Sequence, residues 1–169
     1  MLKGSRDRGS KYLSGMPTPI EALHGVLNAA QALPKLTTSG QPSAAHFEAL
    51  RSAGGAVVLD LRDPSEPRPF DEPALVAGLG MAYHNVPVTP ETMTDDTMDQ
   101  ILGVLRANAH RDVLLHCASA NRVGGPMIAF LMLDHGLSGE QATDQAVRLG
   151  LRSREVMEWG LEYAAKQST

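Results

Sequence analysis

Residues 113–126 read VLLHCASANRVGGP, and this stretch decides how the rest of the chain is interpreted. Val113–His116 is a short apolar run, which is typical of a strand buried on both faces. A glycine pair and Pro126 then open a strongly apolar segment, which predicts a buried helix. The single cysteine of the chain, Cys117, lies between the two. The stretch therefore predicts a strand–loop–helix unit with a thiol in its loop.

Further strands and helices are predicted on both sides of this unit. Leu36–Ser39, Ala56–Leu61 and Met81–Val88 are predicted strands, and residues 62–73, which contain four prolines, are expected to form a surface loop. Capping residues predict helix starts at Thr18, Ser43, Thr94, Ser138 and Ser153, and the first helix is expected to carry the apolar stripe Ile20, Leu23, Val26 and Leu27. A short helix is expected over Leu75–Leu79. Strands alternating with helices predict an α/β fold, with a central, mainly parallel β-sheet flanked by helices.

Length and composition narrow the functional classes. The chain has 169 residues, which suits one domain over residues 17–169, preceded by a flexible tail or cloning remnant at residues 1–16. A net charge of −4 argues against a general nucleic-acid or membrane-surface binder. The sequence contains no apolar run long enough to span a membrane, so we expect a cytoplasmic protein. The histidines lack metal-ligand spacing, so we expect neither a metal site nor a cofactor.

The loop after Val113–His116 has the residue types that nucleophilic chemistry on an oxyanion requires. In open α/β sheets, ligands bind at the carboxyl ends of the strands, and the following helix directs its N–H groups toward them. A thiol placed there ionises readily to a thiolate, and the planar fork of Arg122 suits phosphate or sulfate oxygens. We therefore expect Cys117 and Arg122 to be catalytic, and His116 to make structural hydrogen bonds. The substrate-binding residues are expected to be Ala118, Ser119, Ala120, Asn121 and Val123.

Together with three other segments, this loop resembles the cysteine-dependent phosphatases. The other segments are Ser39–Pro42, Leu61-Arg62 and Tyr83–Val88, so that the resemblance extends over about residues 36 to 150. The chain resembles in particular the small dual-specificity phosphatase-like proteins, and a bacterial branch of these more than the others. That branch is also found joined to, or encoded beside, β-lactamase-like hydrolases and persulfide dioxygenases. The resemblance implies a phosphatase-like fold, Cys117 as nucleophile and Arg122 as anion-binding arginine. It also places Arg62 at an arginine that follows the first central strand, and we include it among the substrate-binding residues.

The loop departs from the phosphatase pattern in its length. Typical tyrosine phosphatases have five residues between the cysteine and the arginine, whereas this chain has four. The shorter Cys-x4-Arg loop has the length found in rhodanese-like sulfurtransferases, which carry a persulfide on the cysteine. In addition, Ala120 replaces a common glycine, which is expected to limit backbone freedom.

A general acid is not evident from the sequence. Dual-specificity phosphatases place an aspartate about thirty residues before the cysteine, and the comparable position here is Thr89. Five other carboxyl groups are candidates: Glu91, Asp95, Asp96, Asp71 and Glu72.

Three functions are compatible with these observations. The leading hypothesis is a phosphatase-like hydrolase in which Cys117 forms a phosphocysteine intermediate, with a phosphorylated substrate. The second is a sulfurtransferase in which Cys117 carries a persulfide taken from a sulfane-sulfur substrate. The third is a module that binds oxyanions without turnover.

Overall fold

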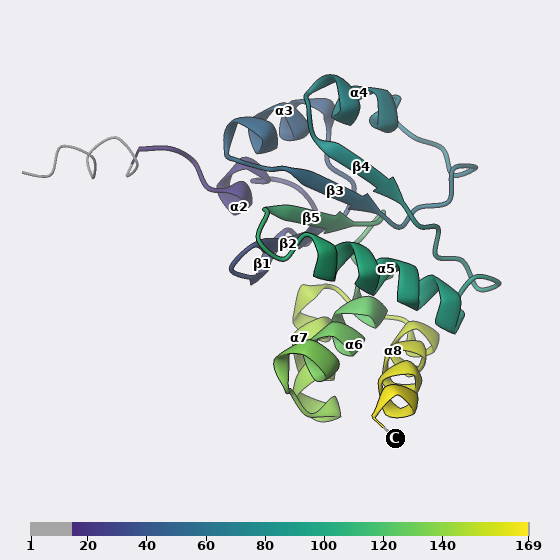
Figure 1. Cartoon of the computed structure of the whole chain (residues 1–169). Coiled ribbons are helices and arrows are strands. Elements are labelled where there is room, and N and C mark those ends of the chain that lie inside the picture. The colour runs from purple at the N-terminus through teal and green to yellow at the C-terminus, as the bar shows by residue number, and fades with distance from the viewer. Residues whose placement is uncertain (1–14, 169) are drawn as a thin grey trace, which may run out of the picture.

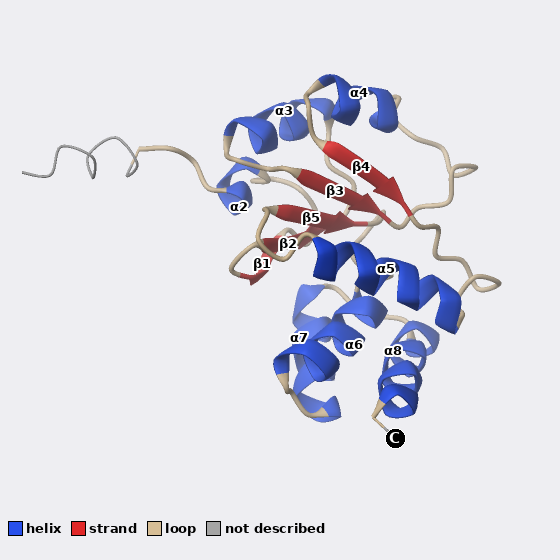
Figure 2. Ribbon diagram, in the orientation of Figure 1, coloured by secondary structure: helices blue, strands red, loops and turns tan. Residues whose placement is uncertain are grey.

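The computed structural model describes residues 15–168, and these form a central sheet between two layers of helices (Figures 1 and 2). Residues 1–14 of the tail expected at residues 1–16 lie outside the described residues.

The sheet has five strands in the order β1-β2-β5-β3-β4. β1 is antiparallel to β2, and the other neighbouring pairs are parallel. The strand that precedes Cys117, β5, therefore lies in the middle of the sheet, and its register pairs His116 with Ser39 on one side and Asp60 on the other. The strands are β1 (Ala30–Leu33), β2 (Leu36–Ser39), β3 (Val57–Asp60), β4 (Ala82–Asn85) and β5 (Val113–His116). The expected α/β fold with a mainly parallel central sheet is confirmed.

The helices cover both faces of this sheet. Figure 1 shows α2, α3 and α4 on one side and α5, α6, α7 and α8 on the other. Their bounds are α2 (Pro19–Ala22), α3 (Ala44–Ser52), α4 (Glu72–Gly78), α5 (Asp95–Ala107), α6 (Gly124–His135), α7 (Gly139–Leu149) and α8 (Arg154–Gln167). Within residues 15–168, no helix combines the length and apolar character needed to cross a membrane.

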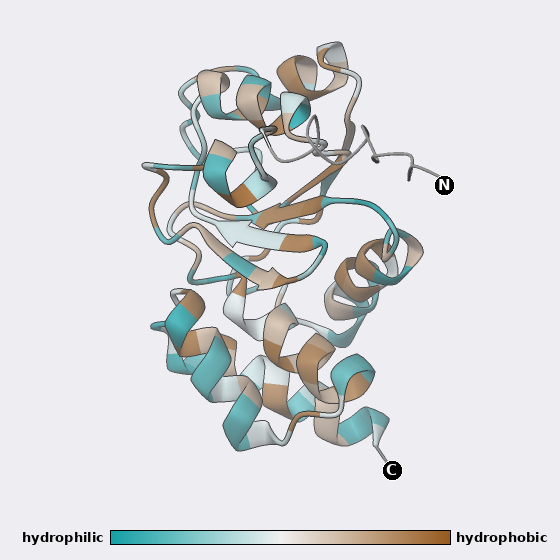
Figure 3. Ribbon diagram, turned by 90° about the vertical axis from the view of Figure 1, so that its left-hand side faces the viewer, coloured by the Kyte–Doolittle hydropathy of each residue, from teal (hydrophilic) through white to brown (hydrophobic). Residues whose placement is uncertain are grey.

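The strands are apolar on both faces because both faces are covered. In β3, Val57 and Leu59 pack with the α5–α8 layer, while Val58 packs with the α2–α4 layer. In β5, Leu114 and Leu115 divide between the two layers in the same way. Figure 3 shows hydrophobic segments on the strands and on the helices that cover them. This arrangement explains the continuous apolar runs, since every residue of a doubly covered strand is buried.

Helix capping was predicted well from local sequence. The side chains of Thr18, Ser43, Thr94, Ser138 and Ser153 each accept a hydrogen bond from a backbone N–H in the first turn of the helix that follows. These caps depend on residues three apart in the chain, so tertiary packing does not override them.

The segment after Thr18 differs from the expectation. Helix α2 ends at Ala22, and Leu27, placed in the buried stripe, is 59% exposed. Gly25 and Asn28 both have positive φ angles (90° and 52°), which turn the chain into β1. The strand β1 was not predicted, because its sequence, AQAL, lacks β-branched and aromatic residues.

Three other boundaries also differ. The strands expected over Ala56–Leu61 and Met81–Val88 are shorter, Val57–Asp60 and Ala82–Asn85. The helix expected over Leu75–Leu79 begins earlier, at Glu72, because the Asp71 side chain accepts a hydrogen bond from the N–H of Ala74.

Two glycines allow α6 and α8 to approach closely. A Cβ atom on Gly160 would lie 2.5 Å from the carbonyl oxygen of Gly125, and one on Gly125 would lie 2.8 Å from Trp159. The glycine pair before Pro126 thus serves helix packing, and it fixes where α6 begins beside the Cys117 loop.

We predict that Gly160→Ala destabilises the protein by about 1–3 kcal/mol, because the added methyl group meets backbone that cannot yield easily. Gly103→Ala in α5 is the matched control, since nothing lies within 4 Å of the position of its Cβ atom. The control should be neutral or stabilising by up to about 1 kcal/mol. Urea unfolding of the three proteins checks both values, and equal stabilities of the two variants would contradict the packing argument.

Candidate active site

Cys117 directly follows β5, at the edge of the sheet where the parallel strands end. Its side chain is buried. Its N–H donates a hydrogen bond to the carbonyl oxygen of Ser39 (3.3 Å), and the carbonyl oxygen of His116 accepts one from the N–H of Leu61 (2.9 Å). The thiol is therefore held at the middle of the sheet by strands on both sides.

The loop from Cys117 to α6 presents unpaired N–H groups. Within residues 15–168, the backbone N–H groups of Ala118, Asn121, Arg122 and Val123 donate to no backbone acceptor, whereas Ser119 pairs with Gly40 in an isolated antiparallel β-bridge. Consecutive free N–H groups before a helix form a concave donor surface that suits an anion. Ala118 and Ser119 are exposed, whereas the side chain of Val123 lies in the core, so that only the backbone of Val123 can meet a ligand.

Contacts from three other segments hold this loop in place. The carbonyl oxygen of Ala118 accepts a hydrogen bond from the N–H of Gln41 (3.0 Å), and that of Ser119 accepts one from the Asn28 side chain (2.9 Å). The Asn121 side chain accepts hydrogen bonds from the N–H groups of Arg152 (2.7 Å) and Ser153 (2.9 Å). Asn121 therefore orients the loop.

Ala120 adopts a left-handed conformation, with φ at 69°. An L-residue other than glycine is strained there, typically by about 1–2 kcal/mol. Its side chain is buried, and a Cβ atom on Gly150 would lie 3.1 Å from the Ala120 Cβ. The alanine at position 120 therefore does not prevent the left-handed turn, although we expected it to limit the backbone freedom of the loop. The close packing of Ala120 against Gly150 stabilises this conformation.

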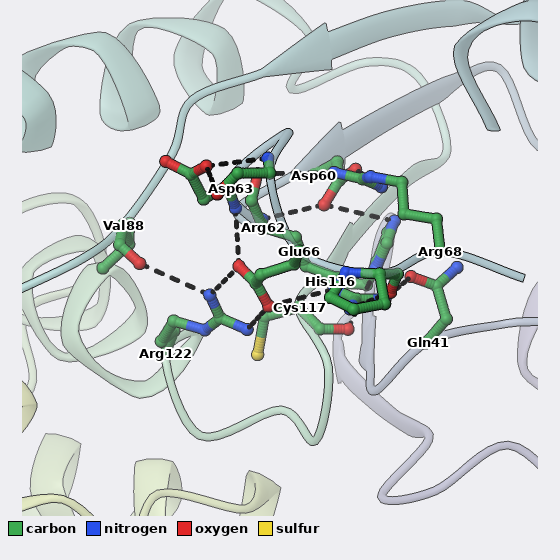
Figure 4. Close-up of polar contacts among 12 residues, drawn as sticks. Gln41, Asp60, Arg62, Asp63, Glu66, Arg68, Val88, His116, Cys117 and Arg122 are labelled. Carbon is green, nitrogen blue, oxygen red and sulfur yellow. Dashed lines mark hydrogen bonds and ion pairs between the residues drawn. The ribbon is translucent and has the colours of Figure 1, made fainter. Parts of the chain in front are cut away.

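Arg122 forms an ion pair that was not predicted. Its two terminal nitrogens donate to the two carboxylate oxygens of Glu66, at 2.7 and 2.9 Å (Figure 4). The hydrogen bonds to Glu66 raise the pKa of Arg122 against the lowering effect of burial, and the neighbouring Cys117 side chain adds to the rise. The guanidinium of Arg122 therefore lies beside both the thiol and a carboxylate.

Arg62 contacts the same carboxylate. Its Nε donates to Glu66 (3.2 Å), and its terminal nitrogens donate to the Gln41 side chain (2.8 Å) and the carbonyl oxygen of Pro67 (2.9 Å). The structure thus brings Arg62 to the site, but through Glu66. Sequence reasoning assigned Glu66 to a surface loop. The spacing Arg62-x-x-x-Glu66 directly after a buried strand was the one available signal.

Beneath the loop, His116 is fully buried and has an acceptor at each ring nitrogen. Nε2 lies 2.7 Å from a carboxylate oxygen of Glu72, and Nδ1 lies 3.1 Å from the carbonyl oxygen of Cys117. Only the doubly protonated ring can donate to both. Burial by itself would lower the pKa of His116, but the hydrogen bond to Glu72 and the charges of Glu72 and Asp60 raise it overall. The structural role expected for His116 is that of a buried cation.

Asp60, at the end of β3, completes this cluster. Its carboxylate accepts hydrogen bonds from the N–H of Arg62 (2.9 Å), from Arg68 (2.5 Å) and from the Tyr83 hydroxyl (2.7 Å). Burial would raise the pKa of Asp60, but the charge of His116 and these hydrogen bonds lower it overall. Asp60 and Glu72 are thus carboxylates opposed by the cations Arg68 and His116.

Asp60, Glu72 and His116 are also the group in residues 15–168 whose arrangement resembles a metal site, with ligand atoms within 4.8 Å of one another. Their contacts argue for a different role. The ring nitrogen of His116 that would bind a metal faces Glu72 as a donor, and Arg68 already neutralises Asp60. We therefore describe these residues as an ionic support for the loop.

None of the five proposed general acids forms a hydrogen bond or ion pair with Cys117 or Arg122. Asp71 caps α4, Glu72 is buried against His116, and Asp95 pairs with Lys166. Glu91 and Asp96 are exposed. Glu66 is the carboxyl group that the fold brings to Arg122. The hydrogen bonds from Arg122 are the main cause that lowers the pKa of Glu66 to about 2, so that Glu66 is ionised at neutral pH.

The ionic cluster predicts how stability depends on pH. A raised pKa of His116 means that the folded state holds this proton more tightly than the unfolded state does. The contribution to stability is therefore complete below the ordinary value of 6.5 and is lost as the pH rises through the raised pKa. The lowered pKa of Asp60 acts in the opposite direction, so its contribution is present above the ordinary value of 3.8 and is lost in acid.

The free energy of unfolding should therefore decrease as the pH rises above the ordinary value of 6.5, as urea titrations at several pH values would measure. Glu72→Gln should flatten this decrease, whereas His110→Gln, which changes an exposed histidine, should leave it as it is. An unfolding free energy that is constant over this range in the unmodified protein would contradict the buried imidazolium.

Comparisons with known proteins bear on this geometry. No family model and no curated protein matches the chain. Among solved structures, it is similar to the "putative phosphatase (DUF442)" of Shewanella putrefaciens, with 25% identity and a TM-score of 0.74 over 87% of this chain and 97% of that one.

Two further structures share the architecture. One is P. aeruginosa TpbA in complex with pTyr, with 18% identity and a TM-score of 0.62 over 82% of this chain and 91% of that one. The other is the core catalytic domain of the PP-IP phosphatase SIW14 of S. cerevisiae, with 16% identity and a TM-score of 0.69 over 83% of this chain and 88% of that one. The chain thus has the fold of the cysteine-dependent phosphatases, with Cys117 directly after the central strand of its sheet.

Proposed function

We propose that the protein is a cysteine-dependent phosphatase-like hydrolase. The observation that carries this proposal is the position of the buried Cys117 thiol, beside the Arg122 guanidinium and before a run of unpaired loop N–H groups. A nucleophile, a cation and backbone donors at one point are what phosphoryl transfer through a covalent intermediate requires.

The proposed reaction has two steps. The Cys117 thiolate attacks phosphorus, the bond from phosphorus to the ester oxygen breaks, and its electron pair leaves with the alkoxide or phenolate. Water then attacks the phosphocysteine, which releases phosphate and regenerates the thiolate. Throughout, the unpaired N–H groups of the loop bind the non-bridging oxygens, and Arg122 balances the charge on them.

A phosphorylated molecule is the proposed substrate. TpbA binds pTyr in its structure, and SIW14 is named for its action on PP-IP, so this fold serves phosphate groups on different carriers. The exposed Ala118 and Ser119 place the loop at the protein surface, which suits a phosphate group presented by a larger molecule.

We predict that Cys117→Ser lowers kcat/KM on an aryl phosphate by at least about 10³-fold, because the nucleophile is lost. Arg122→Lys should lower it by about 10²-fold, since an ammonium group cannot reproduce the planar fork. Steady-state assays, with vanadate as an inhibitor of the unmodified protein, check these outcomes. Full activity of Cys117→Ser would show that the nucleophile is assigned wrongly.

The lack of a proton donor predicts a strong dependence on the leaving group. A nitrophenolate leaves readily as an anion, whereas an alkoxide leaves readily only when it receives a proton. A positioned general acid that supplies this proton typically raises the rate by about 10²–10⁴-fold. We expect kcat/KM for p-nitrophenyl phosphate to exceed that for an alkyl phosphate by at least about 10²-fold. Similar values for the two esters would indicate an acid that moves into the site when substrate binds.

Sulfur transfer is a second candidate, and it is favoured by the lack of a proton donor among the acids that contact Cys117 or Arg122. Glu66 is ionised at neutral pH, and no other candidate acid contacts Cys117 or Arg122. Transfer from thiosulfate needs no acid: the thiolate attacks the outer sulfur, the S–S bond breaks, and its electron pair leaves on sulfite. The four-residue spacing between Cys117 and Arg122 also supports this reading.

Mass spectrometry of Cys117 separates the candidates after incubation with an aryl phosphate or with thiosulfate. A phosphoryl adduct supports the hydrolase, and an adduct with the mass of one sulfur atom supports sulfur transfer. Oxyanion binding without either adduct would favour a binding module and would contradict both enzymes. Because the chain has one cysteine, any adduct on sulfur is assigned unambiguously.

A further inference from the structure

Two large apolar side chains that the core leaves uncovered lie near the cysteine loop. Leu27 is 59% exposed and Val147 is 47% exposed, and within residues 15–168 Met16 is the one other large hydrophobic residue in this class. A single exposed apolar side chain is common on a protein surface, so the position of these two decides whether they matter.

Both side chains belong to segments that hold the cysteine loop. Asn28, which follows Leu27, donates from its side chain to the carbonyl oxygen of Ser119 (2.9 Å). The carbonyl oxygen of Val147 accepts a hydrogen bond from the N–H of Gly150 (3.2 Å), and a Cβ atom on Gly150 would lie 3.1 Å from the Asn28 side chain. The two segments therefore meet at Gly150, directly beside the loop.

Arg152 adds a cation at the same place. Its backbone N–H donates to the Asn121 side chain of the cysteine loop (2.7 Å), and its guanidinium donates to the carbonyl oxygens of Val147 (3.1 Å) and Leu151 (2.6 Å). Among the described residues, Arg152 forms no ion pair with a carboxylate. The two carbonyl groups thus fix an exposed guanidinium whose charge is available to an external anion.

We propose that Leu27, Val147 and Arg152 form a docking surface beside the Cys117 loop, which binds a segment of a phosphorylated protein that has apolar and acidic side chains next to the phosphorylated residue. This inference rests on the proposed function, and it names the partner of the same site. Apolar and cationic groups on separate segments suit an extended polypeptide, because its successive side chains differ in character. An extended chain advances by about 3.3 Å per residue, so the acidic side chain should lie within about three residues of the phosphorylated one.

Turnover of two nine-residue phosphotyrosine peptides tests the inference with the full chain. One peptide has leucine and glutamate within three residues of the phosphotyrosine, and the other has serine at both positions. Phosphotyrosine is the phosphate carrier because a phenolate leaves more readily than an alkoxide when no acid is present. We expect kcat/KM for the first peptide to exceed that for the second by at least about tenfold. Arg152→Gln and Leu27→Ser should each lower this ratio to about threefold or less.

Arg154→Gln is the matched control. It removes the same charge two residues further along the chain, but the Arg154 guanidinium already pairs with Glu158 (2.8 Å). The ratio between the two peptides should therefore stay as it is in the unmodified protein. Arg152→Lys keeps the charge and should restore part of the ratio. If Arg152 only stabilised the end of α7, its substitution would lower the temperature of thermal unfolding and leave the ratio between the two peptides unchanged.

Three outcomes would overturn the docking surface. They are equal kcat/KM values for the two peptides in the unmodified protein, an equal loss of the ratio in Arg154→Gln and Arg152→Gln, and faster release of phosphate from phosphatidic acid vesicles than from either peptide. The last outcome would identify a lipid in place of a protein.

Binding without turnover separates this inference from the proposed function. Fluorescence anisotropy of labelled peptides measures their affinity for Cys117→Ser, with and without Arg152→Gln. If the unmodified protein releases no phosphate but Cys117→Ser still binds the leucine and glutamate peptide at least about tenfold more tightly, the hydrolase is contradicted and the docking surface is supported. Phosphate release without any preference between the peptides has the opposite meaning.

Discussion

A buried positive charge on His116 organises the structure around the candidate site. A charge without access to water must be paired, and an unpaired one would cost several kcal/mol. Glu72 at the start of α4 and Asp60 at the end of β3 meet this requirement, and Arg68 balances the second carboxylate. These contacts tie the loop after β3, helix α4 and strand β5 into one unit. Because His116 also donates to the carbonyl oxygen of Cys117, the same charge orients the start of the cysteine loop.

The cysteine loop is held by its carbonyl groups, its side chains and a β-bridge between Ser119 and Gly40, and most of its N–H groups stay free. Gln41 and Asn28 use loop carbonyls, and Asn121 turns its side chain toward the start of α8. The left-handed Ala120, packed against Gly150, completes the turn at a cost in strain. Strain of this kind persists where the surroundings over-determine the conformation, and it is common at functional sites. The loop is thus arranged as a donor surface before any ligand arrives.

Glu66 links the loop after β3 to the arginine of the cysteine loop, since it pairs with both Arg62 and Arg122. Its carboxylate satisfies Arg122 and Arg62 in the resting state, so that two closely placed cations do not repel each other in a partly buried site. The same carboxylate stays ionised, which makes it a poor proton donor. A site with a nucleophile, paired cations and no acid suits reactions whose leaving group departs as an anion. Activated phosphate esters and sulfane-sulfur donors both meet this condition.

Local sequence determined the strand–loop–helix around Cys117, the helix caps and the central strands, because periodicity and capping act between residues that are close in the chain. The sequence by itself also predicted Cys117 and Arg122 as the candidate catalytic pair, and the structure places their side chains beside each other. Only the tertiary structure decided that Glu66 binds Arg122, 56 residues away along the chain, and that Glu72 binds His116, 44 residues away. Such contacts depend on the order of strands in the sheet, which places the loop after β3 beside the loop after β5, and no local pattern encodes that adjacency.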